Sequence, residues 1–330
     1  NSDYTGLAAD IVAGDTAARA GRKNLFINGG CQVGQRGNVA LSNSAVKYGA
    51  CDRWGMYPNV SNTHSATSSQ ATVTWSESGN AIGWTAVTTV QAGLMLTRQF
   101  IESSNVRHLT GKKLTCSFKV FHDVGADVSV NVLTLKPNSK DNFASTTDLT
   151  SNTMIATAAS GVVTEVSYTW PNALTAADCV NGFCVTIQLG TSTSVTNKNF
   201  YVADLQLEEG SVATDFEHRS YGEELALCQR YFWNAGDDNY GNSSNVHGTQ
   251  TRGLWNIAFP VGMRATPTVT FSDNTTAGKV GVHTAAAGQG FSNNKSVYFS
   301  AGTPYRWTIC CDSTPHHDVR VMHFLASAEL

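Results

Sequence analysis

The sequence predicts an all-β protein, and three observations support this fold class. Short stretches rich in β-branched and aromatic residues recur along the chain, separated by Gly, Asn, Pro and Ser. In one of them Leu114, Cys116, Phe118 and Val120 alternate with polar residues, which is typical of a strand with one buried face. Charged residues make up only 14% of the chain, as expected for strands whose exposed faces are polar but uncharged.

Residues 24–220 are expected to form the first domain. Its predicted strands cover residues 25–27, 53–57, 71–75, 94–101, 113–121, 128–133, 162–170, 183–189 and 200–207. Roughly eight or nine short strands separated by turns, with hardly a helix, predict a β-sandwich. No internal repeat of roughly 20–50 residues is visible, which argues against propellers and solenoids.

A change of hydrophobic period marks the end of this domain. Residues 200–207 alternate like a strand, whereas an apolar stripe at helical spacing follows Ser220 and Glu223. Ser220 can act as the N-cap of a helix, and Glu223 favours its first turn. We therefore predict a short linking helix over residues 221–234.

Two further regions lie at the ends of the chain. Residues 235–330 contain about six short strand patterns and are expected to form a small C-terminal β domain, the tip. Residues 1–23 are rich in Ala, Gly and Asp, so we expect either a flexible leader or a segment that packs against copies of itself. Because a small domain has a thin core, both ends of the chain favour an oligomer.

Composition and charge argue against several classes of protein. The formal net charge is −3 and no run rich in Lys or Arg occurs, so we expect no nucleic-acid binding. No apolar stretch approaches the length of a membrane span, so no membrane insertion is expected. No signal peptide is visible, and we expect the chain to be part of, or processed from, a longer product. Eight cysteines in 330 residues are too sparse for a disulfide scaffold.

Two motifs, made of three segments, resemble the fibre and receptor-binding proteins of tailed bacteriophages. One reads ADLQLEEGSVATDFEHRSYGEELALCQRYF and covers residues 203–232. The other combines NLFINGGCQVGQRG at 24–37 with YGACDRW at 48–54. The resemblance implies a jelly-roll-like β-sandwich and a homotrimer. It also implies that the N-terminal leader joins other virion structural proteins, in a particle assembled in the host cytoplasm and then released.

The same resemblance implies a function in attachment. A tail fibre subunit would recognise host cell-surface polysaccharide by multivalent binding. The alternatives are a head fibre or capsid decoration protein and, with less support, a polysaccharide depolymerase. No Gly-x-Ser-x-Gly elbow, HExxH motif or phosphate-binding loop occurs, so we expect no enzyme activity.

Candidate ligand-binding residues are aromatic and polar side chains outside strand patterns. Trp54, Trp75 and Trp170 lie in apolar runs and are expected in the core, whereas Trp84 is flanked by turn residues and could be exposed. The other candidates lie near the C-terminus, where we predict recognition, in two apparent loops at 285–295 and 312–318 and, for Tyr305, at a loop-to-strand junction. They are Phe291, Asn293, Asn294, Tyr305, His316 and His317.

Calcium is the one cofactor that the resemblance raises, because carbohydrate-binding jelly rolls often hold a structural calcium ion between their first and last strands. Asn28 and Asp204 stand at the corresponding positions. Cys31 and Gln32 replace the Phe and Glu of that motif, so a carboxylate ligand is missing. Otherwise no cofactor is expected. His316 and the adjacent His317 are interpreted as exposed loop residues, not as metal ligands, because neighbours on an extended segment point to opposite faces.

One hairpin is readable in detail. Asn181-Gly182 suits a two-residue turn that would place Cys179 directly opposite Cys184. The two sulfur atoms would then be close enough for a disulfide, although a reducing cytoplasm would keep them as thiols.

Overall fold

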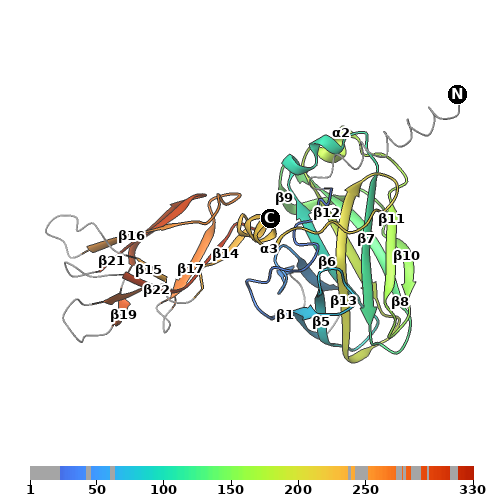
Figure 1. The fold of residues 1–330 in the computed structure, drawn as a ribbon, viewed down its shortest axis with the longest axis horizontal. Helices are drawn as coiled ribbons and strands as arrows, with labels where there is room; N and C mark the ends of the chain where they lie inside the picture. The colour runs from blue at the N-terminus through green and yellow to red at the C-terminus, as the bar shows by residue number, and fades with distance from the viewer. Residues whose placement is uncertain are drawn as a thin grey trace. The chain divides into compact units, whose positions relative to one another are not determined.

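The structure is a computed structural model, and strands dominate it (Figure 1), which confirms the all-β fold class. It describes residues 23–41, 46–59, 64–236, 239–241, 252–272, 277, 280–283, 291–295, 297–312 and 319–330. The chain divides after Ser220 into two compact units, of which the second spans Tyr221–Glu329. No helix among the described residues is long and apolar enough to cross a membrane.

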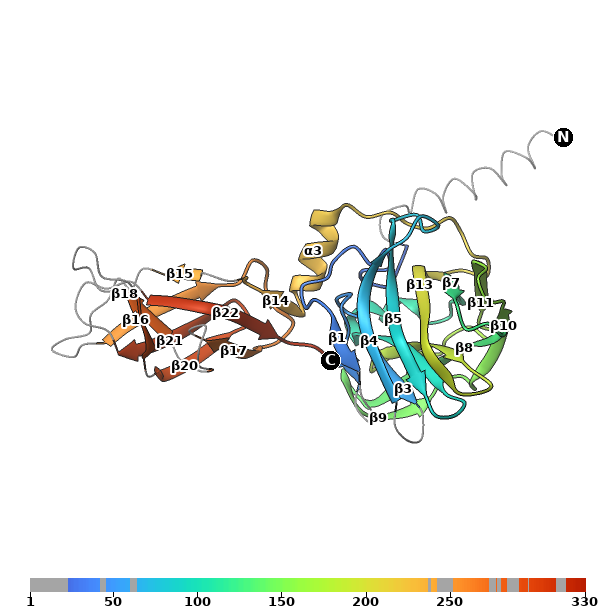
Figure 2. The same cartoon turned by 90° about the horizontal axis from the view of Figure 1, so that it is seen from below.

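The first unit is a sandwich of two antiparallel sheets. The β13 sheet has the order β1 (Val39–Leu41), β4 (His64–Thr72), β5 (Asn80–Thr89), β13 (Val195–Glu209), β7 (Leu114–His122), β11 (Thr164–Thr169). The β12 sheet has the order β10 (Thr153–Ala158), β8 (Val128–Ser139), β12 (Phe183–Gly190), β6 (Leu94–Ile101), β3 (Gly55–Asn59), β2 (Lys47–Tyr48), and β9 (Asn142–Asp148) pairs with β8. Figure 2 shows β4, β5, β13 and β7 side by side. From β5 onward the chain changes sheet at almost every step, as in a jelly roll.

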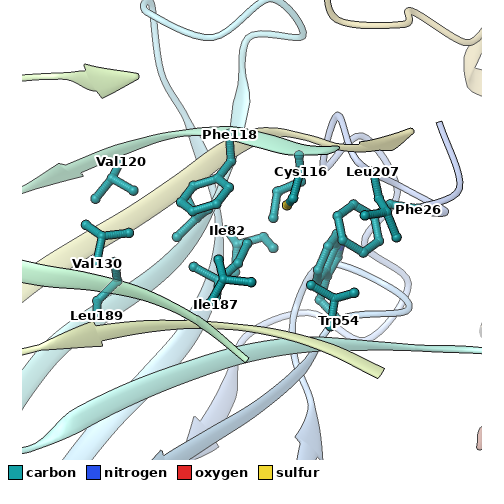
Figure 3. Packing of buried hydrophobic residues seen from close by; sticks show 14 of the residues in the cluster. Phe26, Trp54, Ile82, Cys116, Phe118, Val120, Val130, Ile187, Leu189 and Leu207 are labelled. Carbon is teal, nitrogen blue, oxygen red and sulfur yellow. The ribbon is translucent and has the colours of Figure 1, made fainter. Parts of the chain in front are cut away.

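The core lies between the two sheets (Figure 3) and follows the predicted alternation. Phe118 and Val120 of β7 face Ile187 of β12 across the sandwich. At one end the Trp54 ring meets Phe26 edge-on, with ring centroids 5.0 Å apart. Burying each such large apolar side chain contributes roughly 1.5–3 kcal/mol, so these inner faces hold the sheets together.

The segment that begins the first unit is not a strand, contrary to the prediction for residues 25–27. Its backbone is attached to β13 by a hydrogen bond from the Leu25 amide to the Leu207 carbonyl, at 2.7 Å. The turn after it is held by Asn28, whose Nδ2 donates to the carbonyls of Val33 (2.8 Å) and Asp52 (3.0 Å). The two N-terminal segments that resemble phage fibre proteins therefore interlock.

The segment after β13, residues 211–219, forms a clasp over the same sheet. The Glu208 carboxylate accepts from the Thr214 amide (2.9 Å) and hydroxyl (2.6 Å), and Gln206 Oε1 accepts from the Glu217 amide at 2.7 Å. Arg219 Nη1 donates to the Phe26 carbonyl at 2.9 Å. The third resembling segment thus ties the last strand of the sandwich to its first residues.

The prediction of a Cys179–Cys184 hairpin is wrong. Asp178 Oδ2 accepts from the Thr175 amide (2.9 Å) and hydroxyl (2.6 Å), and this local network starts a short helix, α2 (Ala176–Cys179). Cys179 is therefore helical, whereas Cys184 lies in β12 opposite residues of β6 and β8. Both thiols are free and buried. The other short helices of this unit are the 3-10 turns η1 (Ser103–Asn105) and η2 (Arg107–Leu109).

The second unit begins with α3 (Tyr221–Gln229), at the place of the predicted helix. Its strands are β14 (Phe232–Asn234), β15 (Asn239–Gly241), β16 (Arg252–Ala258), β17 (Thr268–Ser272), β18 (Val280–His283), β19 (Phe291–Lys295), β20 (Val297–Thr303), β21 (Arg306–Asp312) and β22 (Val319–Ser327). β22 pairs with β14, β15, β17 and β18, while β16, β21 and β20 form a second sheet. Because β14 pairs with β22, the end of the expected 221–234 linker belongs to a sheet of the second unit.

Candidate ligand-binding site

Trp84 lies in the core, so its expected exposure is wrong. It lies on β5, is fully buried, and its Nε1 donates to the Thr97 hydroxyl at 2.9 Å. The turn residues that suggested exposure belong to the loop before β5, which begins at Asn80. Trp84 therefore occupies a core-facing position in the middle of a strand and offers no ring surface to a ligand.

The other predicted ligand-binding residues are not brought together by the described parts of the second unit. Tyr305 is 72% exposed at the turn between β20 and β21. Phe291, Asn293 and Asn294 lie on the backbone of β19, which is a strand where a loop was expected. His316 and His317 lie outside the described residues. Ligand binding by this group stays a prediction.

The two residues considered for calcium do not form a cation site. The Asn28 amide is engaged in its own turn, where Oδ1 accepts from the Val33 amide at 3.0 Å. The Asp204 carboxylate accepts from the Glu77 amide and lies 3.0 Å from Lys119 Nζ, which neutralises its charge. Calcium needs several uncommitted oxygen ligands, so these residues do not fit it. The described residues contain no group of three His, Cys, Asp or Glu side chains that could hold a metal.

The outer face of the β12 sheet is unusual because its central strand is buried on both sides. All eight residues of β12 are buried, including Thr186 and Gln188, although the alternating Val185, Ile187 and Leu189 are the ones in the core. An antiparallel sheet commonly has one solvated face. Polar side chains at buried, outward positions must therefore be satisfied by neighbours on the same face.

Arg98 of β6 lies beside Thr186 on this face. Its guanidinium carbon is 5.6 Å from the centroid of the Tyr57 ring, which comes from the next strand, β3. Arg98 Nε is buried and has no hydrogen-bond partner within the described residues. Burial raises the pKa of the nearby Cys184 thiol to about 11, against the opposing effects of Arg98 and Thr186. The thiol is therefore protonated at neutral pH and is not a nucleophile.

Three amides continue the face beside Arg98. Gln188 Oε1 accepts from Asn152 Nδ2 at 3.2 Å, and Asn131 Nδ2 donates to Asn152 Oδ1 at a longer 3.5 Å. Asn131 Oδ1 is buried and accepts from no group in the part of the chain that the structure describes. We call the set of Tyr57, Arg98, Asn131, Asn152 and Gln188 the amide strip.

The amide strip is rich in hydrogen-bonding groups and contains no carboxylate, histidine or lysine. It combines amide donors and acceptors, a guanidinium group that can pair with two oxygens, and one aromatic ring. The sequence analysis missed it. The available signal was the presence of Thr186 and Gln188 at alternate positions of the otherwise apolar FCVTIQLG, because polar residues at that spacing share one face of a strand.

The strip lies on rigid elements. Its strand residues come from four neighbouring strands, β3, β6, β12 and β8, whose registers are continuous across the sheet. Asn152 comes from the loop before β10. Side chains on strands are positioned more precisely than side chains on loops, which favours a preformed binding surface.

Comparisons with known proteins find solved structures of low similarity to this chain. No family model and no curated protein matches the sequence. Among solved structures, one from a study of promiscuous carbohydrate-binding modules of the β-sandwich superfamily has 12% identity and a TM-score of 0.35, covering 50% of this chain and 62% of that one. The enzymatically active domain of tailspike protein 4 of bacteriophage CBA120 has 9% identity and a TM-score of 0.35, covering 57% of this chain and 22% of that one.

A third similar structure is the xylan-binding domain CBM22-2 of Paenibacillus barcinonensis Xyn10C, with 13% identity and a TM-score of 0.31. The match covers 48% of this chain and 92% of that domain. The chain thus spans less than two thirds of the first two structures. Since all three likenesses are distant, the ligand has to be inferred from the residues of this chain.

Proposed function

We propose that this chain is an adhesive virion subunit that binds host-surface polysaccharide through the amide strip. The observation that carries the binding proposal is the pair of buried, unpartnered atoms, Arg98 Nε and Asn131 Oδ1, within one polar face. Leaving a buried polar group unpaired costs about 1–3 kcal/mol. The side chains that carry these atoms are only half-buried, so small rotations would present them to a ligand at this face, and sugar hydroxyls can both donate and accept.

The strip also favours particular sugars. Arg98 is its single charged residue, and a guanidinium group binds a carboxylate through two parallel hydrogen bonds. Sugars that carry a carboxylate, such as uronic acids, would therefore bind more tightly than their neutral counterparts. Tyr57, stacked beside Arg98, would contact the apolar edge of the same ring.

The virion role rests on the resemblance of residues 24–37, 48–54 and 203–232 to phage fibre proteins. We propose a tail fibre subunit that forms a homotrimer and contacts other virion proteins through residues 1–23. A single shallow glycan site has a Kd around 1 mM, or roughly −4 kcal/mol. Several sites on one trimer would gain about two to four orders of magnitude from effective concentration, which suits attachment without chemistry.

The small core of the second unit supports the trimer. Its buried hydrophobic cluster contains Ile257, Phe259, Met263, Ile309, Phe324, Ala326 and Ala328 among the described residues. Such a core supplies little stabilisation by itself, and contacts with further copies would add to it. Sedimentation of the full chain at micromolar concentration tests this, and a stable monomer would contradict it.

The binding proposal is tested with Arg98→Met in the full chain, on an array of neutral and uronate-containing oligosaccharides. Methionine keeps the apolar stem against Tyr57 and removes every donor. We expect binding to uronate-containing spots to fall at least about tenfold, or about 1.4 kcal/mol. Arg107→Met, which removes an exposed arginine of η2, is the control and should bind normally. An Arg98→Met protein that binds like wild type would refute the proposal.

A further inference from the structure

The outer face of the β13 sheet carries a different surface, formed by three aromatic side chains. Phe121 of β7 and Tyr201 of β13 are directly opposite in register, with ring centroids 6.2 Å apart. Trp75, from the loop between β4 and β5, lies 6.2 Å from Phe121 with the rings inclined by 30°. All three are partly exposed and none belongs to the core cluster, so Trp75 differs from its predicted core position.

These rings line a hollow of about 340 Å³, which we call the aromatic hollow. Its remaining lining is Ala71, Thr72, Val73 and Thr74. The volume lies at the small end of the range for ligand pockets and matches one or two sugar rings. Every residue that lines the hollow is uncharged.

The loop that carries Trp75 is fixed without help from the tryptophan. The Val73 amide donates to the Gly79 carbonyl at 2.9 Å, and the Ser78 hydroxyl donates to the Gly30 carbonyl at 2.6 Å. The Glu77 amide is bound by the Asp204 carboxylate at 3.0 Å. Trp75 is thus presented on a loop whose shape is already set, and its ring is not needed to fasten that loop to the sheet.

Two polar groups at the hollow have no hydrogen-bond partner among the residues that the structure describes. Within the described residues the Trp75 indole N–H and the Tyr201 hydroxyl make no hydrogen bond with the protein. Burial, together with the charge of Asp123, raises the pKa of the Tyr201 hydroxyl, which therefore stays protonated as a donor. The hollow combines apolar ring faces with free donors at their edges, which suits a ring that has an apolar face and hydroxyls around it.

We propose that the aromatic hollow is a second glycan-binding site and that it takes a neutral sugar ring. The choice of a neutral ring follows from charge, because the lining has none and the Asp123 carboxylate, whose charge acts on the Tyr201 hydroxyl, would repel an anion. This inference extends the proposed function to a second face and shares its premise that the ligand is a glycan. It does not depend on Arg98 or on any other residue of the amide strip.

A larger hollow on the same sheet carries no such argument. It has a volume of about 440 Å³ and lies between Glu77 and the clasp. Its one lysine is already paired, because Lys119 Nζ lies 3.0 Å from Asp204 and 3.4 Å from Glu77. The aromatic hollow is therefore the better site.

The experiment follows the indole N–H signals of the full ¹⁵N-labelled chain by NMR. Three neutral probes, galactotriose, mannotriose and maltotriose, are added separately at millimolar concentration. We expect the Trp75 signal to move with at least one probe, with a Kd of about 1–10 mM, while the buried Trp84 signal stays in place. Tyr201→Phe, which removes one donor, should raise that Kd about three- to tenfold. Tyr221→Phe, which removes an exposed hydroxyl on α3, should leave it unchanged.

The outcomes separate this inference from the function proposed above. If no neutral probe moves the Trp75 signal, the aromatic hollow is not a sugar site, whatever the arrays show for Arg98. If Trp75 responds but Arg98→Met binds uronates like wild type, the second site stands and the amide strip fails. A shift that Tyr201→Phe and Tyr221→Phe affect equally would also overturn the inference, because binding would not involve the hollow.

Discussion

The two outer faces of the sandwich present their binding groups in different ways. On the β12 sheet the amide strip is built mainly within the strands, and two of its polar atoms, Arg98 Nε and Asn131 Oδ1, are buried. On the β13 sheet Trp75 comes from a loop, and the aromatic rings are partly exposed. One face therefore offers a guanidinium and amides with few apolar contacts, and the other offers ring surfaces with no charge.

This difference has a physical origin in what covers each sheet. The clasp and the 73–79 loop lie over the β13 sheet, so its outward positions are partly used for fastening, as Gln206 and Glu208 show. On the β12 sheet, the outward positions of the central strand are themselves buried. Two sites with different charge preference can thus share one core without sharing a residue.

The largest expected effect separates the two tryptophans that the sequence ranked in the opposite order. Trp84→Ala should lower the free energy of unfolding by about 3–5 kcal/mol, because it leaves a cavity in the core. Trp75→Ala should cost less than about 1 kcal/mol, because its loop is fastened by other bonds. Urea denaturation of the full chain measures both. Equal losses would mean that the Trp75 ring is structural and would weaken the case for the aromatic hollow.

The next effect concerns the clasp, which covers the β13 sheet and not the β12 sheet. Arg219→Met removes charged donors from the carbonyls of Phe26 and Asn24 in a buried setting. We expect a loss of about 2–3 kcal/mol in the free energy of unfolding of the sandwich unit. Arg107→Met should change it by less than about 0.5 kcal/mol. If Arg219→Met changed the free energy of unfolding as little as Arg107→Met, the clasp would not be what closes the sandwich.

A smaller effect depends on pH at Lys119, which lines the larger hollow of the β13 face. Burial lowers the pKa of its ammonium group, but the bonds to Asp204 and Glu77 outweigh this and raise the pKa above 10.5. The stabilisation is therefore complete below pH 10.5 and is lost as the pH rises through the higher folded-state pKa. The difference in unfolding free energy between wild type and Lys119→Met should be about 1 kcal/mol at pH 8 and shrink towards pH 12. A difference that grows with pH would contradict the assignment.

The sequence was sufficient for elements whose period is strong. The alternation in β7 and the change of period at Ser220 predicted a strand and a helix that the structure contains. It failed where side-chain bonds decide the backbone. The segment at 25–27 is held by bonds to β13 and the Asn28 turn, and the Asp178 network turns the expected hairpin strand into a helix.

The candidate site was harder to predict because exposure depends on which face of a strand a residue occupies. Trp84 looked like a loop residue but lies four positions after the start of β5, on the core face. Trp75 looked like a strand residue but lies in the loop, on the outer face. Arg98 and Gln188 meet only because β6 and β12 are neighbours in the sheet, and strand order is not encoded in any local pattern.

The central claim is that the two faces bind independently and with different charge preference. One array of paired neutral and uronate-containing oligosaccharides, probed with wild type, Arg98→Met, Trp75→Ala and Arg107→Met, tests it directly. We predict that Arg98→Met loses uronate-containing spots and keeps neutral ones, that Trp75→Ala does the reverse, and that Arg107→Met keeps both. If Arg98→Met and Trp75→Ala lose the same spots, or neither loses any, the account of two separate sites is wrong.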